Sequence, residues 1–332
     1  MEELKEPKTQ QHNTINKIDK WRQELNQNIL GQKLLIDRLI IAVLCDGHVL
    51  IEGVPGLAKT KVIRQLADGL DAKFKRIQFT PDLLPGDITG TEVYRPDEGS
   101  FNFQQGPIFN QFILADEINR APAKVQSALL EAMEERQVSV GNATYKLPDL
   151  FLVMATQNPI EQEGTYSLPE AELDRFLFYV KIDYPDASFE GQIVELARKE
   201  LLNKNKEYFT STIISQAEIL AARDQVLNIH MSPNLLQYIV ELVLATRTPE
   251  RYGNDLKSWI VNGASPRGTI GLDRAARAHA WLNNREFVTP DDIQSVVHDV
   301  LRHRIILSYE AIADNISTDD VIRTIVSRVA IP

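Results

Sequence analysis

The chain has 332 residues, of which 43% are hydrophobic and 25% charged, and its formal net charge is -10. The length allows two globular domains, and the negative charge disfavours a general binder of nucleic acid or acidic membranes, because such surfaces need clustered Lys and Arg. The single cysteine, Cys45, excludes an intrachain disulfide framework and a multi-cysteine metal site.

The N-terminal segment, residues 1–13, is polar, and we expect it to be a flexible tail. Its acidic start lacks the apolar core of a secretory signal. No apolar run in the chain approaches the roughly 20 residues that a membrane-spanning helix needs. The sequence therefore predicts no membrane insertion and a cytoplasmic location.

Helical periodicity begins after the tail, and a second helix is predicted over residues 32–44. One face of the first helix carries Ile15, Ile18, Trp21 and Leu25. From His48 onward short β-type runs alternate with helical segments. These runs are residues 49–51, 74–79, 112–115, 151–155 and 176–182. Such alternation predicts a parallel sheet flanked by helices, which is a three-layer α/β domain over residues 14–185.

Strands nearly vanish beyond residue 185, and helical patterns replace them. We predict helices at residues 189–202, 215–228, 234–246, 267–282, 291–301 and 318–329. Several begin just after Ser-Pro or Thr-Pro, a pair that supplies an N-cap oxygen and a proline at the first helical position. Residues 186–332 are therefore predicted to form a smaller, all-helical second domain.

A glycine-rich loop between a strand and a helix carries the first functional motif. Its residues are Gly53, Val54, Pro55, Gly56, Leu57, Ala58, Lys59 and Thr60. In this context the backbone N–H groups and the helix N-terminus can hold phosphates; Lys59 would bridge the β- and γ-phosphates of ATP and Thr60 would hold Mg2+. Ala58 stands where a glycine usually precedes the lysine. On this motif alone, a Gly-Pro turn before an ordinary helix is the alternative.

Two adjacent carboxylates end the apolar run at residues 112–115. Asp116 would complete the Mg2+ shell, and Glu117 would orient and polarise the attacking water. A solvated acidic turn is the alternative, although the upstream phosphate loop argues against it. The run at residues 151–155 is followed by Asn158, an amide that could sense the γ-phosphate; an Asn-Pro turn is the alternative here.

Together these motifs resemble the MoxR family of AAA+ ATPases. The resemblance extends from about residue 28 to the C-terminus, and it is carried by residues 53–60, 115–122, 155–159, 168–176 and 264–268. It implies a P-loop AAA+ domain followed by a helical lid. Ala58 departs from the general motif but not from this family. The resemblance also implies that the adenine base is gripped near Gly31 and Gln32 and by the second domain.

Two arginines acquire roles from the resemblance. Arg175 matches the finger that completes the nucleotide site of a neighbouring subunit, where a permanently charged guanidinium suits the developing phosphate charge; a local pair with Asp174 or Glu172 is the alternative. Arg267 matches the sensor of the second domain. It falls in the first turn of a predicted helix, where a cation opposes the helix dipole, so we expect an anionic partner, either the γ-phosphate or a nearby acidic side chain.

Two hairpins interrupt the α/β domain. Residues 91–94 and 100–103 flank a turn of Pro, Asp and Gly, and residues 137–140 and 143–147 flank Gly141-Asn142. They look like the insertions that MoxR proteins share with Mg-chelatase motors and replicative helicase motors, which project toward a channel or a partner. Plain hairpins that protect the sheet edge are the equal alternative.

The leading functional hypothesis is an Mg2+- and ATP-dependent ATPase that forms a ring, as a hexamer, and remodels a partner protein. The resemblance implies a partner with a von Willebrand A domain, and maturation or metal insertion as the outcome. A DNA motor is one alternative, which the net charge disfavours. A nucleotide-gated binding module with little hydrolysis is another, and the combination of Glu117, Asn158 and Arg175 argues against it.

Overall fold

A computed structural model of the chain describes residues 6–54, 59–97, 99–158, 165–202 and 213–331. Its contacts divide the chain into two compact units. The first comprises Met1–Leu168 and Val180–Leu220, and the second comprises Pro169–Tyr179 and Ala221–Pro332. This division crosses the predicted boundary at residue 185 in both directions, because a short segment before it joins the helical unit and a longer one after it joins the α/β unit.

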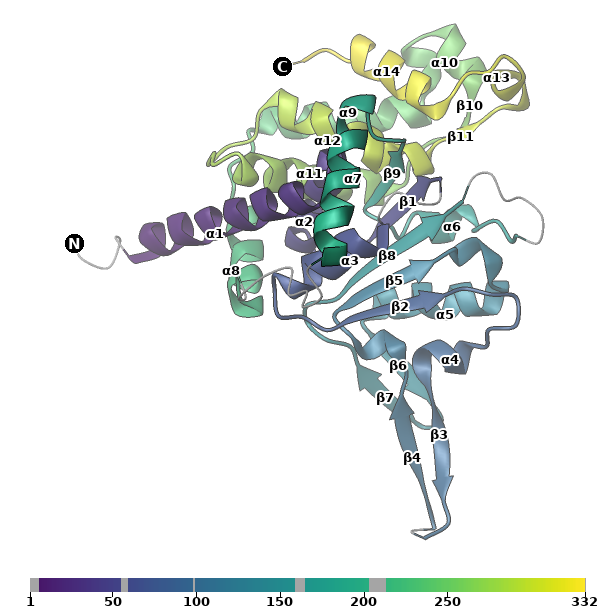
Figure 1. Cartoon of the computed structure of the whole chain (residues 1–332). Coiled ribbons are helices and arrows are strands. Elements are labelled where there is room, and N and C mark those ends of the chain that lie inside the picture. The colour runs from purple at the N-terminus through teal and green to yellow at the C-terminus, as the bar shows by residue number, and fades with distance from the viewer. Residues whose placement is uncertain (1–5, 55–58, 98, 159–164, 203–212, 332) are drawn as a thin grey trace. The chain divides into compact units, whose positions relative to one another are not determined.

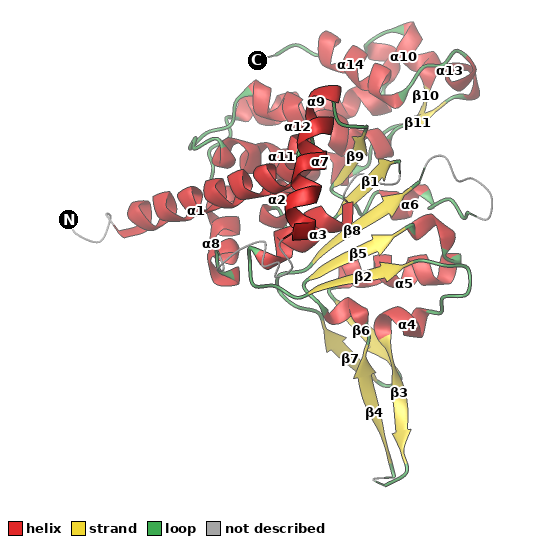
Figure 2. Cartoon of the chain, in the orientation of Figure 1, coloured by secondary structure: helices red, strands yellow, loops and turns green. Residues whose placement is uncertain are grey.

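The first unit is built on a five-stranded sheet of order β2-β5-β8-β1-β9 (Figures 1 and 2). Its strands are β1 (Val49–Gly53), β2 (Phe74–Gln78), β5 (Phe112–Asp116), β8 (Leu152–Gln157) and β9 (Phe178–Ile182). The pairs β2–β5, β5–β8 and β8–β1 are parallel. The sheet confirms the predicted α/β class. Because parallel strands share an orientation, the residues that end β1, β5 and β8 meet at one edge.

Helices accompany the sheet in the first unit. They are α1 (Glu6–Asn28), α2 (Lys33–Leu44), α3 (Lys59–Asp68), α4 (Pro85–Thr89), α5 (Ala123–Glu135) and α7 (Ala187–Leu202), with 3-10 turns η1 (Pro107–Phe109) and η2 (Ile118–Arg120). Helix α1 begins at Glu6, within the segment predicted to be loose. Its first turns contain no apolar residue, so the periodicity gave no sign of them.

The two predicted hairpins are present. Strands β3 (Gly90–Arg95) and β4 (Ser100–Gln105) pair antiparallel, as do β6 (Gln137–Val140) and β7 (Ala143–Lys146). Each hairpin forms a two-stranded sheet of its own, and the described strands of the main sheet do not include them. The rings of Phe103 and Tyr145 stack at a centroid distance of 4.0 Å, which joins one hairpin to the other. Figure 1 shows the β3–β4 hairpin extending away from the sheet.

The second unit is mainly helical. Its helices are α6 (Glu170–Leu173), α9 (Pro233–Arg247), α10 (Asn254–Trp259), α11 (Pro266–Leu282), α12 (Pro290–Leu301), α13 (Tyr309–Ala313) and α14 (Thr318–Arg328), with 3-10 turns η3 (Pro249–Arg251) and η4 (Arg302–Arg304). Helix α8 (Gln216–Leu227) begins in the first unit and ends in the second. A small sheet pairs β10 (Ile260–Asn262) with β11 (Ile306–Leu307).

The predicted Ser-Pro and Thr-Pro starts are confirmed at α9, α11 and α12. The hydroxyl of Ser232 accepts a hydrogen bond from the Leu235 backbone, and Thr289 forms a capping box with Asp292. The strands β10 and β11 and the short helices α10 and α13 were not predicted, because such brief elements contain too few residues for a periodic pattern. None of the helices within the described ranges is long and apolar enough to span a bilayer.

A buried carboxylate ties helices of the second unit together. Asp292 is 0% exposed and accepts hydrogen bonds from Arg285 Nη2 at 2.5 Å and from the His279 ring at 2.6 Å. Burial alone would raise the pKa of Asp292, but these bonds and those from Thr289 hold it well below its usual range. The group is therefore a charged structural anchor.

Candidate functional site

The two predicted carboxylates lie at the end of β5, where the chain turns sharply. Asp116 is the last strand residue, and Glu117 adopts φ 57° and ψ 50°, a left-handed conformation that non-glycine residues rarely take. Thr156, on the neighbouring strand β8 and 1% exposed, holds this turn. Its hydroxyl donates to Asp116 Oδ1 at 2.7 Å and accepts from the Glu117 backbone N–H at 2.9 Å.

We expect Thr156→Val to lower the free energy of unfolding by about 1–3 kcal/mol, because a backbone donor and a carboxylate both lose a partner. Chemical denaturation would measure the change. Thr144→Val removes a hydroxyl from the exposed hairpin, where it lies 3.2 Å from the Ser139 hydroxyl, and should shift stability by no more than about 0.5 kcal/mol. Equal effects of the two substitutions would show that Thr156 does not stabilise the turn.

Strand β2 supplies further partners for the acidic pair. Arg76 donates from Nη2 to Asp116 Oδ2 at 2.6 Å, and Gln78 donates from Nε2 to Glu117 Oε2 at 2.7 Å. Arg120 Nε lies 3.2 Å from the same Glu117 oxygen. Neither Arg76 nor Gln78 was predicted from the sequence. Their spacing of two residues on a strand places both on one face, and that alternation is the signal that could have found them.

The structure describes the two ends of the predicted phosphate loop. Gly53 ends β1, with Val54 following, and Lys59 begins α3, with Thr60 next; Pro55, Gly56, Leu57 and Ala58 lie outside the described residues. A Cβ at Gly53 would lie 2.7 Å from the Ile182 carbonyl oxygen, so the strand requires glycine there.

Lys59 lies in the electrostatic field of the acidic pair. Its ammonium donates to the Gly53 carbonyl oxygen at 2.5 Å. Burial lowers the pKa of Lys59, and the carboxylates of Asp116 and Glu117 act in the opposite direction. Asn158 follows β8, the strand between β5 and β1, and therefore lies at the same edge. The first unit thus brings together Lys59, the acidic pair and Asn158.

The donor set at this edge has a recognisable chemistry. An ammonium at the start of a helix is suited to phosphate oxygens. Carboxylate and hydroxyl oxygens, here from Asp116 and Thr60, are the ligands that Mg2+ takes from proteins when phosphates supply the others. These residues therefore fit a magnesium nucleotide, with Lys59 on the phosphate side.

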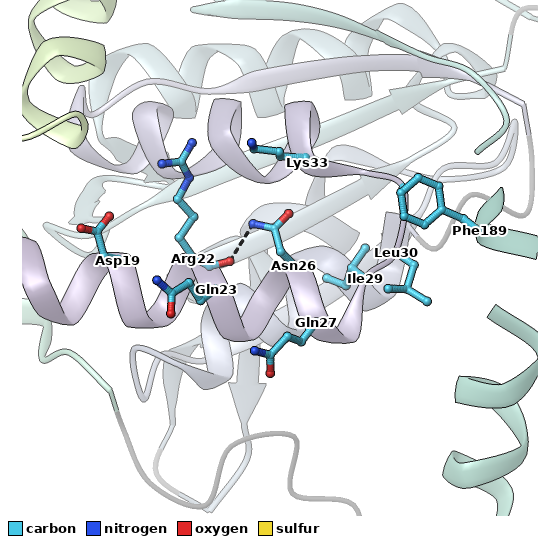
Figure 3. Close-up of a pocket in the computed structure, with 10 residues that line it drawn as sticks. Asp19, Arg22, Gln23, Asn26, Gln27, Ile29, Leu30, Lys33 and Phe189 are labelled. Atoms are coloured by element: carbon cyan, nitrogen blue, oxygen red, sulfur yellow. Dashed lines mark hydrogen bonds between the residues drawn. The ribbon is translucent and has the colours of Figure 1, made fainter. Parts of the chain in front are cut away.

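Gly31 lines a cavity of about 690 Å3 between α1, the start of α2 and Phe189 of α7 (Figure 3). Its lining is completed by Asp19, Arg22, Gln23, Asn26, Gln27, Ile29, Leu30 and Lys33. Ile29, Leu30 and Phe189 gather at one end, and charged and amide groups at the other. Gly31 has φ +74°, and a Cβ there would lie 2.7 Å from Pro185 Cβ. Gln32 is buried and directly precedes α2.

Arg175 and Arg267 both belong to the second unit. Arg175 follows α6, and Arg267 occupies the first turn of α11, where its backbone N–H donates to the Ser265 hydroxyl at 3.1 Å. The carboxylate of Asp174 accepts from Arg304 Nε at 2.7 Å through Oδ1 and from the Ser265 hydroxyl at 2.7 Å through Oδ2. Both oxygens of the Asp174 carboxylate therefore accept hydrogen bonds from within the second unit.

Comparison with known proteins agrees with this architecture. Residues 48–178 match the model of the ATPase family associated with various cellular activities (AAA), and residues 257–325 match the AAA lid domain. Over 310 residues the chain is 47% identical to Chaperone MoxR1 of Mycobacterium tuberculosis, covering 93% of this chain and 81% of that protein. It is 36% identical over 304 residues to Protein MoxR of Paracoccus denitrificans, covering 86% and 87%.

A solved structure is also similar along its whole length. The crystal structure of a candidate ATPase from Cytophaga hutchinsonii is 48% identical, with a TM-score of 0.93 and complete coverage of both chains. The parallel sheet with its acidic edge, followed by a helical lid, defines an AAA+ ATPase. Within that class, the identity to the MoxR proteins shows that the chain belongs to the MoxR family.

Proposed function

We propose that this protein hydrolyses ATP to ADP and phosphate with Mg2+, forms a ring of subunits, as a hexamer in the cytoplasm, and uses the cycle to remodel a partner protein. The observation that carries the proposal is the shared edge of Lys59, Asp116, Glu117 and Thr156 in a MoxR-family chain. The name of the relative Chaperone MoxR1 supports the remodelling role.

Each predicted site residue has a task in this proposal. Lys59 and the loop from Gly53 to Thr60 hold the phosphates, while Thr60 and Asp116 supply oxygen ligands to Mg2+, which neutralises phosphate charge when bound. The adenine base lies near Gly31 and Gln32. Asn158 positions the attacking water. Arg175 serves the neighbouring subunit, and Arg267 senses the γ-phosphate.

Glu117 orients and polarises that water. The contacts from Gln78 and Arg120 both reach its Oε2 atom, and this fixes the plane of the carboxylate. Oε1 is then the atom that accepts a hydrogen bond from the water. The left-handed backbone of Glu117 supports the same task, because strained residues that the surrounding structure holds in place are concentrated at functional sites.

The partner is a protein in this proposal, and a von Willebrand A domain protein is the class that the family resemblance suggests. The β3–β4 hairpin is the surface that we assign to it. The side chains of Tyr94 and Phe101 are 52% and 66% exposed there, and their rings lie 5.2 Å apart. Exposed aromatic side chains with few rotatable bonds are favourable contact groups at protein interfaces.

Glu117→Gln tests the proposal, because the substitution changes water activation and leaves the Mg2+ ligand Asp116 in place. We expect unchanged ATP affinity by calorimetry and single-turnover hydrolysis slowed by about 100-fold or more. The variant should then hold ATP and retain its partner in a pull-down.

The matched control is Glu131→Gln, on an exposed position of α5, which should leave turnover at the wild-type rate. Loss of ATP binding by Glu117→Gln would assign Glu117 to metal binding or structure. Unchanged turnover would remove it from the reaction.

A further inference from the structure

Arg175 and Arg267, the two arginines of the proposed nucleotide site, both belong to the helical unit. Arg175 lies in the segment Pro169–Tyr179, which clusters with the helical unit although it precedes β9 of the main sheet. Arg267 lies in α11 of that unit. The residues beside them are in direct contact, because the Ser265 hydroxyl donates to Asp174 Oδ2 at 2.7 Å.

Arg304, in η4, is the cation that fixes this contact. Its side chain is 2% exposed. It donates from Nε to Asp174 Oδ1 at 2.7 Å, and from Nη2 to the Phe176 carbonyl oxygen at 2.7 Å and the Asp174 carbonyl oxygen at 3.0 Å. One guanidinium therefore holds a carboxylate and the backbone on both sides of Arg175.

The Arg304 guanidinium is buried, and its charge depends on the groups that contact it. Burial lowers the pKa of Arg304 to about 10, while the Asp174 carboxylate raises it, so the side chain stays charged at neutral pH. A buried charge is tolerated only when its partners stay in place. The neighbouring His303 adds a bond from Nε2 to the Phe176 carbonyl oxygen at 3.0 Å. The backbone after Arg175 is thus held by consecutive residues of η4.

Asp174 also connects the segment that carries Arg175 to the start of α11. The Ser265 hydroxyl that donates to Asp174 also accepts the backbone N–H of Arg267 at 3.1 Å, as the N-cap of the helix. Helix α11 also packs beside Arg304, since a Cβ added at Gly268 would meet Arg304 Cδ at 3.4 Å, an ordinary van der Waals distance. A Cβ added at Gly271 would meet Leu177 Cδ1 at the same distance, so the helix also lies beside the segment that carries Arg175.

We propose that Arg304 and Asp174, joined through Ser265, are positioning residues that hold the finger Arg175 and the sensor Arg267 in one fixed geometry. The inference rests on the proposed function, which gives these two arginines their tasks. The new element is that Arg175 and Arg267 act as one rigid element. Any movement of the helical unit would reorient both arginines together.

Arg304→Lys tests the grip, because an ammonium keeps the charge but lacks the planar fork that reaches a carboxylate and two carbonyls at once. We expect kcat for ATP hydrolysis to fall about tenfold or more, since small displacements of positioning groups have large rate effects. The Kd for ATP, measured by calorimetry, and ring assembly should remain within about twofold of wild type, because Lys59 and its loop are untouched.

Ser265 provides a milder and reversible test of the same link. Ser265→Ala removes the hydroxyl that joins Asp174 to the Arg267 backbone, whereas Ser265→Thr keeps a hydroxyl at the N-cap. We expect the alanine variant to lose kcat and the threonine variant to recover most of it. This pair decides the question even if Arg304→Lys does not fold.

Arg285→Lys is the matched control, because it weakens an arginine grip on the buried Asp292 elsewhere in the same unit. We expect its melting temperature to fall as that of Arg304→Lys does, with wild-type kcat. An equal loss of kcat in the control would make the effect of Arg304 merely structural. Wild-type kcat in Arg304→Lys and Ser265→Ala, with Arg175→Ala inactive, would overturn the positioning role alone. An active Arg175→Ala would instead overturn the proposed function.

Discussion

Replacing Lys59 with alanine should remove productive ATP binding. Lys59 is the cation that the structure places at the start of α3, in the field of Asp116 and Glu117. Without it, the phosphates would face two carboxylates and lose charge-assisted hydrogen bonds worth about 1.5–3 kcal/mol each. We therefore expect affinity to fall by at least about 100-fold in calorimetry, and hydrolysis to disappear with it.

A second lysine of the same helix serves as the control. Lys61 Nζ pairs with Glu200 at 2.6 Å. Lys61→Ala therefore removes a positive charge and an ion pair from α3 without touching the proposed phosphate contacts. Its affinity for ATP should stay close to that of wild type, because partly exposed ion pairs contribute little. Near-normal ATP binding by a folded Lys59→Ala protein would refute the phosphate-loop assignment.

The fold was predictable because its strands are buried and parallel. The sheet lies inside its unit, so strands such as β5 and β8 are continuous apolar runs with helices between them. Hairpins were predictable from turn residues such as Gly141, which has φ +57°. The part of helix α1 before Ile15 was not predictable, because helix turns without apolar residues show no hydrophobic periodicity. The assignment of residues 169–179 to the helical unit depends on contacts distant in sequence.

The candidate site was predictable where its residues are adjacent in the sequence. Asp116 and Glu117 follow one strand, and Asn158 follows another, so strand ends indicate them directly. The left-handed backbone of Glu117 could not be predicted, because glutamate is not a residue type that is typical of positive φ. Gln78 and Arg76 stand on a different strand from the carboxylates they contact. Arg304 lies 130 residues from Asp174, and a single sequence carries no signal for such a pair.

Arg175→Ala should abolish hydrolysis while each subunit still binds ATP. A finger arginine is worth about a thousandfold or more in rate, because it neutralises charge that develops only during the reaction. Phosphate release should therefore fall by that factor, and the calorimetric Kd should stay near wild type. Arg323→Ala is the control: Arg323 is an exposed arginine of the same unit, paired with Asp320 at 2.7 Å, and its loss should leave the rate unchanged.

Mixing variants tests whether the arginine acts between subunits. An Arg175→Ala subunit keeps its pocket and a Lys59→Ala subunit keeps its finger, so mixed rings contain some complete sites. Activity should partly return on mixing, and the specific activity of wild type should rise with protein concentration as rings assemble. A wild-type monomer with concentration-independent activity, and no recovery on mixing, would refute the finger role. Arg175 would then have a local structural role beside Asp174, whose carboxylate already binds Arg304 and Ser265.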